Sequence, residues 1–138
     1  MRKIFLLLLV PFLYLSCSTE PETEDVAYEL LPISEVQLPA NFNVNKDNII
    51  KIKFVRPTEC HAFNKFYSEK NGSTNTIAVE STVFKYSNGE CAALQNQNVA
   101  TQNLKFKPTE TGEYTLKFWK GKDSSESDLF LTYTILVE

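Results

Sequence analysis

The sequence has few of the residues from which common catalytic and cofactor sites are built. It contains only four glycines and a single histidine, His61. It lacks the glycine-rich loop of nucleotide-binding proteins, and a Ser-His-Asp or Cys-His arrangement would depend on His61 alone. The carboxylates that a histidine-free glycoside hydrolase requires are scattered over expected strands and turns. The sequence therefore disfavours an enzyme, and it predicts no cofactor and no metal.

Long apolar stretches are equally scarce. The longest one runs from Ile4 to Leu15, follows Arg2 and Lys3, and is interrupted by Pro11. A transmembrane helix needs about 20 apolar residues, whereas basic residues followed by a short apolar stretch are typical of a secretory signal peptide. We therefore expect residues 1–16 to be a signal peptide and the rest of the chain to be exported.

This apolar stretch ends in Leu15, Ser16 and Cys17. These residues resemble the lipobox of bacterial lipoproteins, although Tyr14 stands where that family usually has an aliphatic residue. The resemblance implies that Cys17 becomes the mature amino terminus and carries a diacylglycerol thioether and a further acyl chain, which together anchor a protein stably. The implied partner is a membrane, reached through the lipid on Cys17. The alternative is ordinary cleavage nearby, which leaves Cys17 free.

An acidic segment follows the cysteine. Residues 18–25 read STEPETED and contain no apolar side chain, so we expect residues 17–26 to form a lipidated cysteine and a flexible tether. Removal of residues 1–16 lowers the number of basic residues from 14 to 12 while 17 acidic residues remain, which gives a net charge of −5. This balance disfavours nucleic acid and anionic bilayers as electrostatic partners.

Acidic residues directly after a lipidated cysteine resemble the surface-export signal of lipoproteins in the Bacteroidota. The residues that correspond here are Glu20, Glu22, Glu24 and Asp25. The resemblance implies a location in the bacterial cell envelope, anchored by lipid to the outer membrane and exposed on the cell surface. The periplasmic face of that membrane is the alternative.

Two cysteines remain once Cys17 is assigned to lipid. Cys60 and Cys91 form an even pair, and an oxidising envelope maintains disulfides. We therefore predict a Cys60–Cys91 disulfide. A metal site that also uses His61 is the alternative, but the short ligand spacings typical of zinc sites are absent.

The remaining residues, 27–138, have the length of one domain. Apolar and polar residues alternate with period two, which is typical of half-buried strands. Strands are expected within residues 27–38, 48–56, 61–67, 76–86, 102–107, 113–119 and 129–137. About seven short strands separated by turns predict an all-β fold, a single antiparallel β-sandwich.

One local motif refines this prediction. Glu110, Gly112 and Tyr114 resemble the D-x-G-x-Y tyrosine corner of immunoglobulin-like domains, with Glu110 in place of the usual aspartate. The resemblance implies an immunoglobulin-like sandwich in which the Tyr114 hydroxyl bonds to nearby backbone. Leu116 stands where that family has its strand F cysteine, so the antibody-type disulfide is absent.

A broader resemblance covers most of the exported chain. The segments RPTECHAF at 56–63, TIAVESTVF at 76–84 and TGEYTLKFWKGKD at 111–123, together with Cys91, resemble small uncharacterised lipoproteins of flavobacteria and their relatives. That group implies a fold and a location, and it implies no activity.

Aromatic residues are the remaining candidates for recognition. The chain has ten Phe, six Tyr and one Trp, and most are expected in the core. Trp119 alternates with Thr115 and Lys117, which places it on the face opposite Tyr114 and Phe118. The following polar loop is of the kind that mediates recognition. The candidate ligand contacts are Trp119, Lys120, Lys122 and Asp123.

The sequence therefore predicts a non-catalytic, lipid-anchored envelope protein with an interaction or structural role. Its partner would be a protein or a glycan. A surface glycan-binding module is the alternative, because aromatic side chains stack well on sugars, and an enzyme is the third possibility.

Overall fold

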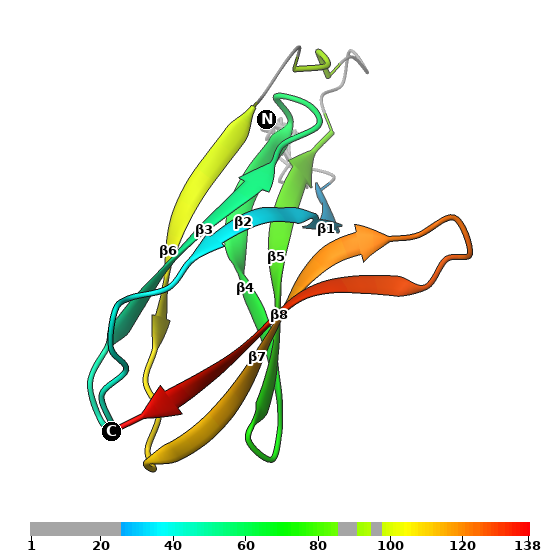
Figure 1. Cartoon of the computed structure of the whole chain (residues 1–138). Helices are drawn as coiled ribbons and strands as arrows, with labels where there is room; N and C mark the ends of the chain where they lie inside the picture. The colour runs from blue at the N-terminus through cyan, green and yellow to red at the C-terminus, as the bar shows by residue number, and fades with distance from the viewer. Residues whose placement is uncertain (1–25, 86–90, 95–97) are drawn as a thin grey trace, which may run out of the picture.

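The computed structural model describes residues 26–85, 91–94 and 98–138, which form eight β-strands in two packed sheets (Figure 1). Within these ranges there is no helix, and hence none long and apolar enough to cross a membrane. The predicted all-β sandwich is confirmed. The strands are β1 (Val26–Leu31), β2 (Ile33–Gln37), β3 (Asn48–Val55), β4 (His61–Asn71), β5 (Thr74–Phe84), β6 (Val99–Phe106), β7 (Gly112–Lys122) and β8 (Asp128–Val137).

The smaller sheet has the order β2-β3-β6 and is antiparallel throughout. In the five-stranded sheet, β4 pairs with one edge of β5, while β1 and β7 share its other edge. Strand β1 runs antiparallel to residues 79–84 of β5, β7 runs parallel to residues 74–77, and β8 pairs with β7. This arrangement brings residues of β4, β5, β7 and β8 side by side across one surface.

Eight strands are present where about seven were expected, because the stretch 27–38 is split at Pro32. Proline has no N–H to donate to a strand ladder and is therefore confined to strand edges and ends. The chain leaves β1 at this point and crosses to the other sheet as β2. Pro32 also packs near Gly121, where an added Cβ would lie 3.6 Å from the proline ring.

The core lies between the two sheets and follows the predicted alternation. Ile50, Ile52 and Phe54 of β3 are fully buried, as are Leu116 and Phe118 of β7. Burying each such side chain contributes about 1.5–3 kcal/mol relative to exposure. The side chains between these positions must therefore point outward, which assigns one set of residues to each outer face of the sandwich.

The tyrosine corner is present at the start of β7. Tyr114 is 7 % exposed, and its hydroxyl donates a hydrogen bond of 3.1 Å to the Glu110 carbonyl oxygen. Gly112 between them has φ 128°, a conformation that side chains disfavour. The molecule thus shares the sandwich and this corner with immunoglobulin-like domains, whereas its β5–β7 pair is parallel rather than antiparallel.

Candidate functional site: the outer face of the five-stranded sheet

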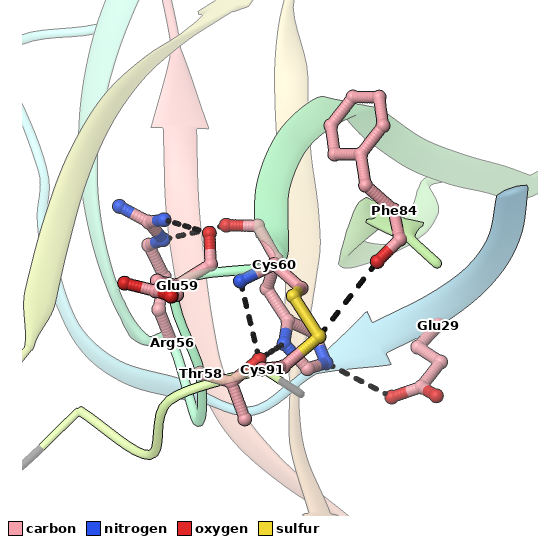
Figure 2. The surroundings of a disulfide bond; sticks show 8 residues. Glu29, Arg56, Thr58, Glu59, Cys60, Phe84 and Cys91 are labelled. Atoms are coloured by element: carbon pink, nitrogen blue, oxygen red, sulfur yellow. Dashed lines mark hydrogen bonds and ion pairs between the residues drawn. A yellow bond between two sulfur atoms is a disulfide. The ribbon is translucent and has the colours of Figure 1, made fainter. Parts of the chain in front are cut away.

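The predicted disulfide joins Cys60 to Cys91, with a Cα–Cα distance of 5.6 Å (Figure 2). It attaches residues 91–94 to the turn that precedes β4. Two backbone hydrogen bonds of 3.1 Å support the attachment, from Glu59 N–H to the Ala92 carbonyl and from Leu94 N–H to the Pro57 carbonyl. Both sulfurs are used in the bond, and the described ranges contain no group of three or more side chains suited to a metal.

His61 lies beside this disulfide and is buried. Its Nδ1 is 2.8 Å from the Thr58 hydroxyl and its Nε2 is 3.2 Å from a carboxylate oxygen of Glu29 on β1 (Figure 2). Thr58, His61 and Glu29 are connected in the order of a hydrolytic triad. Whether this cluster could catalyse acyl transfer depends on the hydrogen-bond donors around Thr58. An acyl-transfer site needs free N–H groups beside the nucleophile to form an oxyanion hole.

The three amides after Thr58 are already used inside the protein. Glu59 N–H donates to the Ala92 carbonyl, Cys60 N–H to the Thr58 hydroxyl at 3.3 Å, and His61 N–H to the Thr58 carbonyl at 3.2 Å. The Arg56 guanidinium also donates to the His61 carbonyl at 2.6 Å. We therefore assign a structural role to the Thr58, His61 and Glu29 cluster. The contact between His61 and Glu29 links β1 to the start of β4.

Cys17 and residues 18–25 of the acidic tether lie outside the described residues, whereas Val26 begins β1. The other predicted contact residues lie on β7 or directly after it, and Figure 1 shows the distal part of the β7–β8 hairpin extending past the other strands. Lys120 is exposed at a bulge in the β7–β8 pair. Lys122 is exposed and lies 3.4 Å from Glu126.

Asp123 organises the turn of this hairpin. Its carboxylate accepts hydrogen bonds from Ser125 N–H at 2.7 Å and Ser127 N–H at 3.0 Å, and its own N–H donates to the Ser127 carbonyl at 2.9 Å. Glu126 has φ 61° within this turn. Aspartate is favoured in such turns because its side chain caps nearby backbone N–H groups. One carboxylate oxygen of Asp123 is therefore occupied by the loop itself.

Trp119 lies on the outer face of the sheet, opposite Tyr114 and Phe118, as the alternation predicts. It is half-buried, and its indole N–H donates to Asp128 at 2.8 Å. Trp119 pairs with Phe130 of β8. The last β5–β7 pair joins Ile77 to Phe118, so Ala78 and Trp119 are the next residues of these two strands and face outward. Ala78 in turn pairs with Tyr67 of β4.

The register pairs Tyr67 with Ala78 and Trp119 with Phe130, and Ala78 and Trp119 directly follow the last β5–β7 pair, so these four residues lie on the same outer face of four strands. Ala78 is only 4 % exposed although it points outward, which means that neighbouring side chains cover it. Tyr67 is 45 % exposed. The ammonium of Lys117 lies 4.5 Å from the centre of the Phe130 ring, a cation–π contact.

Strand β1 extends this surface. Tyr28 is 63 % exposed and pairs with Thr82, while Leu30 is 44 % exposed and pairs with Glu80. Both lie on the same side of the sheet as Ala78, because Thr82 and Glu80 alternate with it along β5. We call this surface the aromatic face and define it as Tyr28, Leu30, Tyr67, Ala78, Trp119 and Phe130.

The outer face of the three-stranded sheet is different. Its middle is polar, with Ile49 at one end and Val55 and Val99 at the other; the polar residues are Glu35, Gln37, Lys51, Lys53, Thr101, Asn103 and Lys105. A hydrogen bond from Lys53, with a second from Gln37, lowers the pKa of Glu35. The paired strands of the three-stranded sheet therefore present no aromatic side chain outward, whereas the five-stranded sheet presents aromatic residues flanked by polar ones.

Sequence reasoning identified Trp119 but missed the rest of the aromatic face. The alternation within residues 61–67 and 129–137 places Tyr67 and Phe130 on strands, yet only the strand pairing brings them onto the same face as Trp119.

No protein family model, curated protein or solved structure matches this chain significantly. The function is therefore inferred from the residues themselves.

Proposed function

We propose that the chain is a lipid-anchored, non-catalytic protein of the bacterial cell envelope that binds a partner through the aromatic face. The observation that supports this most strongly is the contrast between the two outer faces. Tyrosine, tryptophan, phenylalanine and leucine lie on the outer face of the five-stranded sheet, with polar residues beside them, whereas the paired strands of the other sheet present no aromatic residue outward. Contiguous exposed apolar surface on a small domain is typical of an interaction site.

Side chains of the aromatic face are held in place before any partner arrives. The hydrogen bond to Asp128 holds the Trp119 indole, and Lys117 lies over the Phe130 ring. Binding through groups that are already ordered loses less side-chain entropy, and aromatic anchors dominate the energetics of many interfaces. The face is therefore suited to recognition.

The proposed anchor would hold this face near a membrane. Val26, the first residue of β1, is nine residues after Cys17. Nine extended residues span at most about 30 Å. We propose that the lipid on Cys17 holds the domain at the outer membrane, on the cell surface, within reach of a partner in the envelope or just outside it.

Site-specific photo-crosslinking tests the binding surface. A benzophenone amino acid placed at Tyr67 in the full chain, in its own envelope, should give covalent adducts, because this exposed position lies on the aromatic face. The matched control is the same amino acid at Thr101, which is exposed on the other sheet. Equal adduct yields at the two positions would contradict the proposed binding surface.

Metabolic labelling with a fatty-acid probe tests the anchor. The wild-type chain should take up the probe and fractionate with membranes, because acylation of Cys17 supplies two or more chains. The Cys17→Ser variant should be unlabelled. Uptake of label by both chains, or by neither, would refute lipidation at this cysteine.

A further inference from the structure

We propose that the ligand of the aromatic face is a neutral polysaccharide whose pyranose units are joined equatorially, as in β-1,4-linked glucans, xylans and mannans. This inference rests on the proposed function, since it names the partner of the same surface. Three features of the face support it: the spacing of the rings, the polar rows beside them, and the balance of charge.

The spacing of Tyr67 and Trp119 suits successive sugars. Paired strands lie about 4.8 Å apart, so β4 and β7 lie about 9.5 Å apart where both pair with β5. Trp119 directly follows the last β5–β7 pair, so we expect a similar backbone separation between Tyr67 and Trp119. This is about the length of two equatorially linked pyranose units. The apolar C–H faces of such sugars stack on aromatic rings, so Tyr67 and Trp119 could each contact one sugar of the chain.

Polar side chains run beside these aromatic residues on both sides. One neighbouring row, on the same four strands, consists of Glu69, Thr76, Lys117 and Thr132. On the other side, Glu80 accepts a hydrogen bond of 2.8 Å from Asn64 and lies 3.4 Å from Lys65. Sugar hydroxyls both donate and accept hydrogen bonds, and these two rows provide carboxylates, hydroxyls, amides and ammonium groups for both roles.

The charge of the face favours a neutral sugar over an acidic one. Lys117 is placed over the Phe130 ring, and Lys65 lies beside Glu80. Both lysines therefore already have an interaction partner within the face. Glu69 adds a further negative charge. The exported chain as a whole has more acidic than basic residues. The two lysines and the two glutamates named here balance, so the face has no excess positive charge to attract an acidic polysaccharide or an anionic lipid surface.

Trp119 provides a direct readout because it is the only tryptophan of the chain. We would reconstitute the full lipidated protein in phospholipid vesicles and titrate it with soluble β-glucan, xylan, galactomannan and polygalacturonate. At least one neutral polysaccharide should produce a saturable change in Trp119 emission. The Tyr67→Ala variant should raise the half-saturating concentration at least about tenfold, the effect expected when a central aromatic anchor is lost.

The matched control is Ile49→Ala, which removes an exposed apolar side chain from the other outer face and should leave the titration unchanged. A response to polygalacturonate alone would overturn the proposal, as would no response to any neutral polysaccharide. Quenching of Trp119 by brominated acyl chains, without a sugar response, would identify the face as membrane-bound and overturn it too. If the polysaccharide proposal fails in this way, crosslinking from Tyr67 but not from Thr101 would still support the aromatic face as a binding surface. The two experiments therefore test the two proposals independently.

Discussion

Replacing both Cys60 and Cys91 by alanine is expected to lower the free energy of unfolding by about 3.5 kcal/mol, the chain-entropy effect of a disulfide that closes a loop of this length. The two cysteines are separated by 31 positions, so the unfolded chain loses much of its freedom when they are joined. A loss of this size is a large share of the 5–15 kcal/mol that stabilises a typical domain.

The measurement is urea denaturation of residues 18–138, which lack Cys17 and therefore any third thiol. Alanine is preferred to serine because Cys60 is fully buried, and a serine hydroxyl would be buried there without a designed partner. Adding reductant to the wild-type chain is the control, since it opens the same loop without removing either side chain. Coinciding midpoints for the oxidised wild type and the double variant would show that the bond does not stabilise the fold.

Replacing Tyr114 by phenylalanine should destabilise the domain by about 1–3 kcal/mol, the range for leaving a buried polar group unpaired. The substitution keeps the ring, including its edge-to-face contact with Phe106 at 5.7 Å between ring centres. It removes only the hydroxyl that donates to the Glu110 carbonyl. The loss would therefore report the hydrogen bond of the tyrosine corner.

Thermal and denaturant unfolding of the two chains measures this effect, and each kcal/mol should lower Tm by about 4 °C in a domain of this size. The matched control is Tyr28→Phe, because Tyr28 is 63 % exposed and its hydroxyl can bond to water in either state. If Tyr114→Phe is as stable as Tyr28→Phe, the corner hydrogen bond contributes nothing to the stability of the fold.

The strands were predictable because a sheet with one face on the core imposes a two-residue period on the sequence. Isoleucine, lysine and phenylalanine alternate along β3, and the buried members are the apolar ones. The outward position of Trp119 was predictable from the same period. The Cys60–Cys91 bond was predictable by counting, since an exported chain with one cysteine assigned to lipid leaves an even pair.

Strand partnership was not predictable in the same way. Alternation says which side of its own strand a residue occupies, but it does not say which strand lies next to it or in which direction. The parallel pairing of β5 with β7 ends at Ile77 and Phe118 and so brings the next residues, Ala78 and Trp119, onto the same outer face; nothing within either segment specifies this register. The aromatic face therefore became visible only when the strands were assembled.

Asp123 shows a second limit of sequence reasoning. A polar loop after a strand predicts ligand contact, but it does not predict that one carboxylate oxygen of Asp123 accepts two hydrogen bonds from its own loop. An aspartate carboxylate accepts hydrogen bonds equally from a ligand or from the backbone N–H groups of its own turn. Only the positions of the Ser125 and Ser127 amides distinguish the structural use.

The central claim is that the aromatic face is covered in the living envelope. Hydroxyl-radical footprinting tests it most directly, by comparing oxidation of Tyr67 and Trp119 in intact cells with oxidation in the purified full chain. The account predicts that both residues are protected in cells, while Ile49 and Val55 on the other sheet are oxidised equally in the two preparations. Equal oxidation of Tyr67 and Trp119 in cells and in the purified chain would contradict it.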